Sequence, residues 1–270
     1  MSDEENDHRP KRRLGTALAR GRARRWPIPH PHQVTEVHGE APATRLDPRL
    51  RVLVWNVFKG KRPSWAPAFR TLAEDRDLIL AQELYFEPKT HALLRESALQ
   101  WTTATSFSYA SRGHVGTGLG TAARAHARRS DALRSAAREP LTGTPKLALL
   151  TSYALHDGGE DRELLVVNVH AINFAGFGSF AGQLHRIEAA IEQHDGPLLL
   201  AGDFNTWSSR RLRRLADLAR AAALEPVEFP EDRRVTILDH AFIRGLRAAD
   251  AQLHRSRASD HAALSFALEP

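Results

Sequence analysis

The sequence contains no cysteine among its 270 residues. Disulfide bonds, thiolate metal sites and cysteine nucleophiles are therefore excluded. Any metal ion has to be held by Asp, Glu, Asn or His side chains. Ligands of this kind favour a hard cation, so we expect Mg²⁺, with Mn²⁺ as the alternative.

Long apolar runs are also missing. No segment has the length of a signal-peptide core or a membrane-spanning helix, so we expect no membrane insertion and a cytoplasmic protein. Arg12-Arg13 resembles half of a twin-arginine signal, but the apolar region that should follow it is absent. A glycine-rich stretch lacks the GxGxxG spacing of a dinucleotide loop and predicts a strand with a close backbone neighbour; it contains Gly113, Gly116, Gly118 and Gly120.

The charge is basic, with a formal net charge of +6 and a pI of about 10.1, and arginine dominates the cations. Such an excess suits a phosphate-bearing partner, although arginine and alanine are abundant throughout the chain. Residues 1–48 are predicted to be a basic, disordered N-terminal tail, and residues 49–270 a single domain. The tail either lies on nucleic acid or anionic lipid, or is simply solvated.

Apolar segments of strand length repeatedly end in polar side chains. The run 198–202 leads into Asp203 and Asn205, which strand alternation would place on the same side. A Gly-Asp-x-Asn sequence is also typical of a turn, so this segment alone leaves both interpretations open. The pattern recurs along the chain, at Asn56, Gln82-Glu83, Asn168 with His170, Asp239, and Asp260-His261.

Helical periodicity appears between these strands, over residues 64–74, 88–100, 179–194 and 208–222. In the last helix we expect Leu212, Leu215 and Leu218 to face inward. The arginines of that helix (Arg210, Arg211, Arg213, Arg214) are predicted to face mostly outward, as a solvated face or a track for phosphates. Residues 122–138 are predicted to be helical or a basic surface insertion. The alternation of strands and helices suggests layers of helix packed on sheet.

The recurrence of polar strand ends favours one shared site over unrelated turns. Carboxylate, carboxamide and imidazole groups around a hard cation suit the hydrolysis of a phosphate ester by activated water. Asp239 and His261 are each placed where a carboxylate–imidazole pair could orient the histidine.

These motifs, in their order along the chain, resemble the endonuclease/exonuclease/phosphatase (DNase I-like) superfamily, from about Leu50 to the C-terminus. The sequences around these motifs most resemble a bacterial, YafD-like subgroup of unassigned substrate. The resemblance implies an α/β (α+β) fold: a four-layer αββα sandwich of two mixed, mostly antiparallel sheets flanked by helices. The motifs are Trp55-Asn56-Val57, Gln82-Glu83, Asn168-Val169-His170, Gly202-Asp203-Phe204-Asn205, Leu238-Asp239 and Ser259-Asp260-His261.

The resemblance also implies roles for residues. Glu83 would be the main metal ligand, with Asn56 and Asp260 near the metal or its waters. Asp203 would orient or deprotonate the attacking water. The remaining positions would contact the phosphate or assist the groups that do: Asn205 and Asn168 at phosphate oxygens, His261 oriented by Asp239, and His170 at the phosphate or the leaving oxygen. This chain has His240 at a position where many relatives have an aromatic residue. His240 either crowds or extends the site, or only packs against its neighbours.

The expected activity is a magnesium-dependent phosphodiesterase, most readily a nuclease, acting as a monomer on a phosphate-ester substrate such as nucleic acid. A phosphomonoesterase or a lipid or inositol phosphodiesterase is an alternative with the same residues. A third alternative is a non-catalytic nucleic-acid-binding module that uses the arginines of the tail and of helix 208–222.

Overall fold

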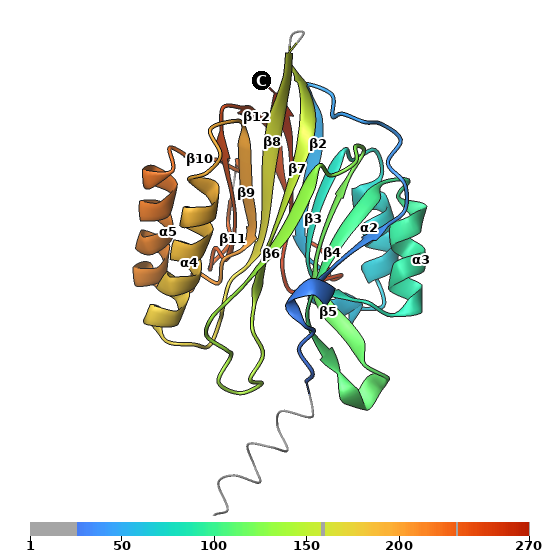
Figure 1. Cartoon of the computed structure of the whole chain (residues 1–270), viewed down its shortest axis with the longest axis vertical. Helices are drawn as coiled ribbons and strands as arrows, with labels where there is room; N and C mark the ends of the chain where they lie inside the picture. The colour runs from blue at the N-terminus through green and yellow to red at the C-terminus, as the bar shows by residue number, and fades with distance from the viewer. Residues whose placement is uncertain (1–25, 158–159, 231, 270) are drawn as a thin grey trace, which may run out of the picture.

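Two mixed β-sheets lie face to face between two pairs of helices, as the computed structural model in Figure 1 shows. The structure describes residues 26–157, 160–230 and 232–269. The predicted four-layer αββα sandwich is confirmed. The acidic start of the chain and the arginines up to Arg25 lie outside the described residues.

One sheet has seven strands in the order β1-β4-β5-β3-β2-β13-β12. In it β2 and β3 run parallel, and the other described neighbours are antiparallel. The strands in chain order are β1 (Thr35–His38), β2 (Leu50–Asn56), β3 (Leu78–Tyr85), β4 (Gln100–Tyr109), β5 (Val115–Ala123), β12 (Arg247–His254) and β13 (Ala263–Glu269).

The second sheet has six strands in the order β10-β11-β9-β8-β7-β6, with β8 and β9 parallel. Its remaining described neighbours are antiparallel. In chain order the strands are β6 (Arg129–Arg134), β7 (Leu147–Asp157), β8 (Glu160–His170), β9 (Leu198–Asp203), β10 (Glu225–Pro226) and β11 (Asp239–Arg244).

Four α-helices cover the outer faces of the two sheets. The seven-stranded sheet packs on α2 (Trp65–Ala73) and α3 (Pro88–Glu96), and the six-stranded sheet on α4 (Phe177–Ile191) and α5 (Ser209–Ala221). Short 3₁₀ helices lie at Pro31–Gln33, Phe58–Gly60 and Ala110–Arg112. None of the helices in the described ranges is long and apolar enough to cross a membrane.

The core of the described residues has three large apolar clusters and a small fourth one around Ala104 and Leu149, because the central strands are buried on both faces. Val54 and Leu80 of one sheet contact Val166 and Leu199 of the other in the cluster between the sheets. Separate clusters lie under each helix pair. This two-sided burial explains why the strand sequences read as continuous apolar runs rather than alternating patterns.

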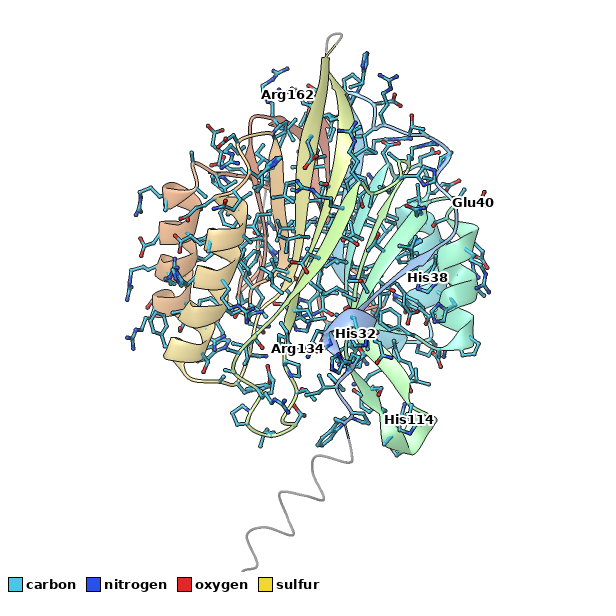
Figure 2. The ribbon with its side chains drawn as sticks, in the orientation of Figure 1. His32, His38, Glu40, His114, Arg134 and Arg162 are labelled. Atoms are coloured by element: carbon cyan, nitrogen blue, oxygen red, sulfur yellow. The ribbon has the colours of Figure 1, made fainter. Side chains whose placement is uncertain are left out.

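The four parallel strands bring their C-terminal ends to one end of the sandwich. β2 lies against β9, and β3 against both β8 and β9, so the polar residues in the last part of these strands meet. Figure 2 places Arg162, near the start of β8, and His114, beyond the end of β4, at opposite ends of the molecule. The site lies toward the His114 end, where β8 reaches His170.

Three sequence-based expectations need correction. The ordered domain begins before residue 49, because β1 pairs with β4 and the predicted tail therefore ends earlier. Residues 129–134 are an edge strand paired with β7, not a helix. In α5, Leu212 is exposed and Arg211 is buried, the reverse of the predicted orientation.

The Gly202→Ala substitution should destabilise the fold. Gly202 in β9 has φ +139°, and a Cβ there would lie 2.1 Å from the carbonyl oxygen of Val169. We expect a loss of about 2–3 kcal/mol in the free energy of unfolding, measured by urea denaturation. Gly182→Ala in α4 is the control, because its Cβ would meet nothing within 4 Å. That variant should gain up to about 1 kcal/mol. Equal stability of the two variants would contradict the argument.

Candidate active site

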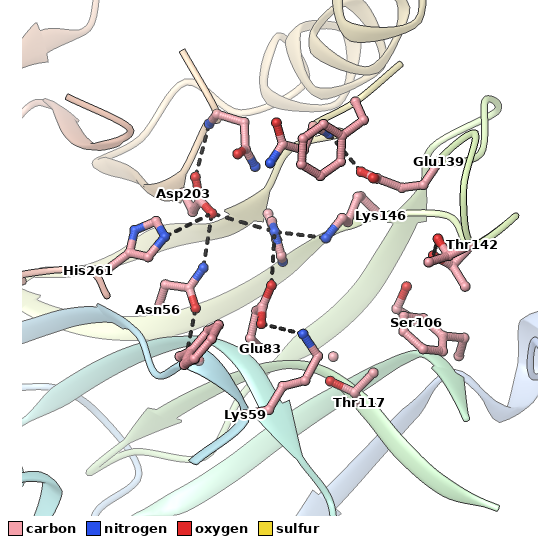
Figure 3. Close-up of a pocket in the computed structure, with 18 of the residues that line it drawn as sticks. Asn56, Lys59, Glu83, Ser106, Thr117, Glu139, Thr142, Lys146, Asp203 and His261 are labelled. Atoms are coloured by element: carbon pink, nitrogen blue, oxygen red, sulfur yellow. Dashed lines mark hydrogen bonds and ion pairs between the residues drawn. The ribbon is translucent and has the colours of Figure 1, made fainter. Parts of the chain in front are cut away.

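A cavity of about 460 Å³ opens between the sheets at the end where the parallel strands finish (Figure 3). It is lined by residues from both sheets and from the loops that follow them. Seven of the nine predicted site residues line it: Asn56, Glu83, His170, Asp203, Asn205, Asp260 and His261.

Asp203, the last residue of β9, lies at the centre of this constellation. Its Oδ2 accepts a hydrogen bond from Asn56 Nδ2 at 3.0 Å, and its Oδ1 accepts one from the backbone N–H of Asn205 at 3.0 Å. His170 Nε2 lies 3.5 Å and His261 Nε2 4.0 Å from Asp203 Oδ2. Burial, assisted by the negative charge of Asp239, raises the pKa of Asp203 to about 7. The carboxyl group can therefore exchange a proton near neutral pH.

Asn205 reaches the cavity by a different route from the one that strand alternation predicts. β9 ends at Asp203, and Asn205 has a left-handed backbone with φ +50°. Its side-chain Nδ2 donates to the carbonyl oxygen of Ala171. Asp203 and Asn205 line the same cavity, but a turn and not strand alternation brings Asn205 there.

Asp239 lies behind His261 and holds its imidazole. The Nδ1 atom of His261 is 3.0 and 2.9 Å from the two carboxylate oxygens of Asp239. Burial alone would lower the pKa of His261, but the hydrogen bond and charge of Asp239 outweigh it and raise the pKa to about 9. The predicted pair is thus present, and its histidine is a cation at neutral pH.

Glu83 is turned into the cavity by an irregularity in β3. The register between β3 and β5 shifts between Ala81 and Leu84, and Glu83 itself has φ +56°. Such bulges commonly redirect a side chain beside a functional site. Burial opposes ionisation of Glu83, but His170 and the lysines Lys59 and Lys146 lower its pKa to about 2. Glu83 is therefore fully charged.

Two lysines in the cavity were missed by the sequence analysis. Lys59 Nζ lies 2.5 Å from Glu83 Oε2, and Lys146 Nζ lies 3.0 Å from His170 Nε2. Burial lowers the pKa of Lys146, while burial and the charge of Lys146 hold the pKa of His170 well below its usual value. With His170 neutral, Lys59 is the close charge that keeps Glu83 ionised. The sequence signal that could have pointed to them is the rarity of lysine, since only five of the 38 Lys and Arg residues are lysine.

Asn168 does not line the cavity. It is buried between the sheets, where its Nδ2 donates to the carbonyl oxygens of Ala81 and Gly120 and its Oδ1 accepts from Gln82 Nε2. All of its hydrogen-bonding groups are used within the protein. The predicted phosphate contact by Asn168 therefore has no support in the geometry, and the residue joins β8 to the opposite sheet instead.

Arg211 fixes the loop that forms one wall of the cavity. Although it belongs to the arginine-rich α5, its side chain is only 1% exposed. Its guanidinium donates to the carbonyl oxygens of Ile172, Asn173, Ala175 and Asn205. These bonds tie the segment after β8 to the segment after β9, so Arg211 positions both walls.

His240 packs outside the cavity. Its ring is stacked on Phe242, and its Nε2 lies 2.8 Å from Thr206 Oγ1. Burial lowers its pKa to about 4, so it remains neutral. Of the two interpretations of this residue, the packing role fits the structure.

The chemistry of the lining residues fits a hard divalent cation. Glu83, Asn56 and Asp260 line the same cavity with two carboxylates and a carboxamide, whose Oδ1 also accepts from the backbone N–H of Phe58 at 3.1 Å. A second acidic group in the described residues consists of Asp203, Asp239 and His261, with ligand atoms within 4.8 Å of one another. In that group the Nδ1 atom of His261 and the carboxylate of Asp239 are already paired with each other.

Comparisons with known proteins agree with this arrangement. The model of a family described as "Endonuclease/Exonuclease/phosphatase family" matches residues 53–261. A UPF0294 protein of Yersinia pseudotuberculosis serotype O:1b (strain IP 31758) is 40% identical over 226 residues, covering 82% of this chain and 84% of that protein.

Two solved structures share the fold. The human Nocturnin catalytic domain, with a bound sulfate anion, has a TM-score of 0.63 at 16% identity and covers 87% of this chain and 97% of its own. A mannosyl-6-phosphatase of Bacteroides thetaiotaomicron VPI-5482 has a TM-score of 0.59 at 12% identity, covering 81% of this chain and 99% of its own. At these identities the likeness concerns the fold alone.

The Asn168→Ala substitution should reduce stability, because it leaves buried groups on the opposite sheet unpaired. We expect the free energy of unfolding to fall by about 2 kcal/mol or more, measured by urea denaturation. Asn173→Ala on the cavity wall is the matched control, since its side chain makes one partly exposed bond with Trp207. It should change stability by less than about 1 kcal/mol. A neutral Asn168→Ala would refute the cross-sheet role.

The His261–Asp239 pair should make stability depend on alkaline pH. Because the folded-state pKa of His261 is raised from 6.5 to about 9, its stabilisation is complete below pH 6.5 and is lost as the pH rises through 9. In Asp239→Asn the pKa should fall by about one unit or more. The imidazole Cε1–Hε1 signal in NMR spectra measures this pKa directly. An unchanged pKa in Asp239→Asn would show that another group raises it.

Proposed function

Because the chain belongs to the endonuclease/exonuclease/phosphatase family, we propose that it is a divalent-metal-dependent phosphodiesterase that hydrolyses nucleic acid. The observation that carries this proposal is the position of Asp203. Its carboxyl group lies in the cavity among hydrogen-bond donors, and its pKa of about 7 suits the transfer of a proton from water.

In this proposal Asp203 orients and deprotonates the attacking water, and Asn56 and the backbone of Asn205 hold the carboxylate in place. A general base works best when its pKa lies near the working pH. The side chain of Asn205, beside Asp203, contacts the water and a phosphate oxygen. Arg211 supports this arrangement because it binds the carbonyl oxygen of Asn205.

The cations of the cavity bind the phosphate and stabilise the charge that develops on it. His261 is protonated and fixed by Asp239, so its Nε2–H can donate to a phosphate oxygen. Lys146 adds a second donor on the opposite side, next to His170. The lowered pKa of His170 supports a hydrogen-bonding role at the phosphate over a role as proton donor to the leaving oxygen.

Glu83, Asn56 and Asp260 are the residues proposed to hold the metal ion, with Mg²⁺ as the first candidate and Mn²⁺ as the second. When bound, such an ion supplies Lewis-acid stabilisation of the phosphoryl oxygens. Lys59 pairs with Glu83 and helps to keep its carboxylate ionised.

Nucleic acid is favoured as the substrate class by charge and by the cavity rim. The chain has a net charge of +6, and the side chain of Phe174 on the cavity lining is 66% exposed. Exposed aromatic rings beside cationic grooves stack with nucleobases in a sequence-tolerant way. An intact set of acid, amide and imidazole groups argues against a module that only binds nucleic acid.

A phosphomonoesterase is the second candidate, because a protein with this fold is described as a mannosyl-6-phosphatase. Analysis of the products separates the two activities. Release of inorganic phosphate from monoesters, with diesters left intact, would favour this second function over the first.

Metal-dependent diester hydrolysis should disappear in Asp203→Ala. We expect wild-type protein with Mg²⁺ or Mn²⁺ to cleave at least one of labelled single-stranded DNA, double-stranded DNA, RNA and a chromogenic phosphodiester, and EDTA to stop it. Asp203→Ala should be slower by about a thousandfold or more. Asp217→Ala, an exposed carboxylate on α5, is the control and should retain full activity. Turnover that is insensitive to EDTA or to Asp203→Ala would refute the proposal.

A further inference from the structure

A second cavity of about 330 Å³ lies on the other side of His261. It shares Leu238, Asp260 and His261 with the first cavity, so the two spaces adjoin at the proposed reaction centre. Its walls come from the segment before β11 and from the segment between β12 and β13. Within these two segments, the proposed chemistry uses only Asp260 and His261, which also line the first cavity.

The second cavity is lined by arginines. Three of them line it together with His261, against the carboxylates of Asp239 and Asp260. Asp239 is paired with His261 through both carboxylate oxygens. The arginines are Arg233, Arg234 and Arg255. An anion entering this space would therefore meet guanidinium donors.

The three arginines have different tasks. Arg234 is committed to the protein, because it binds the carboxylate of Asp232 and donates to the carbonyl oxygen of Asp239. It thereby fixes the loop behind the proposed site. Arg233 and Arg255 are exposed. Within the described parts of the chain neither makes a hydrogen bond, although Arg255 lies close enough to Asp232 to lower the pKa of that carboxyl. Their guanidinium groups are free to bind a ligand.

We propose that Arg233 and Arg255 form a subsite for a phosphate that flanks the scissile one, so that the substrate is a polynucleotide strand rather than a small phosphate ester. The inference rests on the proposed function. A small diester held at Asp203 and His261 would leave the second cavity unused. A nucleic acid strand continues past His261 and brings its next phosphate to the two arginines, which suit phosphate through paired N–H donors.

A lipid with a second headgroup phosphate carries the same anion, but the surroundings favour a nucleic acid. The first cavity has aromatic residues in its lining, including the exposed Phe174, which suits a nucleobase next to the scissile phosphate. Most residues of the second cavity are arginine, serine, threonine and aspartate, and its apolar members are Val235, Leu238 and Ala262. The polar majority suits a sugar–phosphate backbone better than acyl chains.

The test compares thymidine dinucleotides that differ by one phosphate. The substrates are the dinucleotide itself, its 5′-phosphorylated and 3′-phosphorylated forms, and bis(p-nitrophenyl) phosphate as the minimal diester. For wild-type protein one phosphorylated form should have a KM lower by about five- to tenfold, as expected for two exposed charge contacts. In Arg233→Gln/Arg255→Gln this preference should vanish, while kcat/KM for the minimal diester stays within about twofold. Arg213→Gln, an exposed arginine of α5, is the control and should keep the preference.

The outcomes separate the two proposals. Hydrolysis of the minimal diester with no preference for an extra phosphate would overturn the subsite and leave the proposed function standing. Loss of the minimal-diester activity in the double variant would also overturn it, because the arginines would then act on the scissile phosphate. A preference that depends on the arginines for glycerophosphoinositol 4-phosphate, and not for the dinucleotides, would overturn the polynucleotide assignment.

Absence of hydrolysis of every diester would refute the proposed function, and binding then tests the subsite by itself. Dissociation constants for the phosphorylated and unphosphorylated dinucleotides can be measured with Asp203→Ala protein by titration calorimetry. The phosphorylated form should bind about five- to tenfold more tightly, and only while Arg233 and Arg255 are present. Equal affinities would refute the subsite.

Discussion

The structure depends on one constraint: the two sheets have to be held in a fixed position relative to each other. Asn168 fixes that position close to the site, because its carboxamide forms hydrogen bonds with the backbone and a side chain of the opposite sheet in an otherwise apolar interior. A buried amide is stable only when all of its groups are paired, so the two sheets have little freedom to slide. The strand ends that carry Asn56, Glu83, His170 and Asp203 are thereby held opposite one another.

Electrostatic balance is the second condition on this site. Carboxylates brought together in a buried site would repel one another, and two of them are each paired with a cation. Glu83 is matched by Lys59, and Asp239 by His261, while Asp203 is left with neutral hydrogen-bond donors as its closest partners. The pKa of Glu83 is consequently lowered and that of Asp203 is raised. Two carboxylates of similar chemistry acquire different protonation behaviour because their partners differ.

Much of the fold follows from the sequence because its central strands are uninterrupted apolar runs bounded by polar residues, and its helices have a clear apolar stripe. The pairing of Asp239 with His261 was also predictable from motif order. Local sequence patterns fail to predict the structure where contacts between distant residues determine it. Residues 129–134 have a helix-like composition but are held as a strand by pairing with β7. Arg211 has the sequence context of a solvated arginine, yet four carbonyl oxygens across a turn bury it. Lys59 and Lys146 belong to the cavity only because distant segments converge there.

The bonds made by Arg211 bear on how a substrate enters. A loop whose carbonyl oxygens are held by a buried guanidinium cannot swing open without breaking several charge-assisted hydrogen bonds at once. The cavity wall at residues 172–175 is therefore preformed instead of acting as a lid. Binding of an anion to a preformed cavity in a chain of net charge +6 needs no opening step, so encounter is governed by diffusion and the attraction of opposite charges. The speed of capture then depends on ionic strength rather than on the rate of a conformational change.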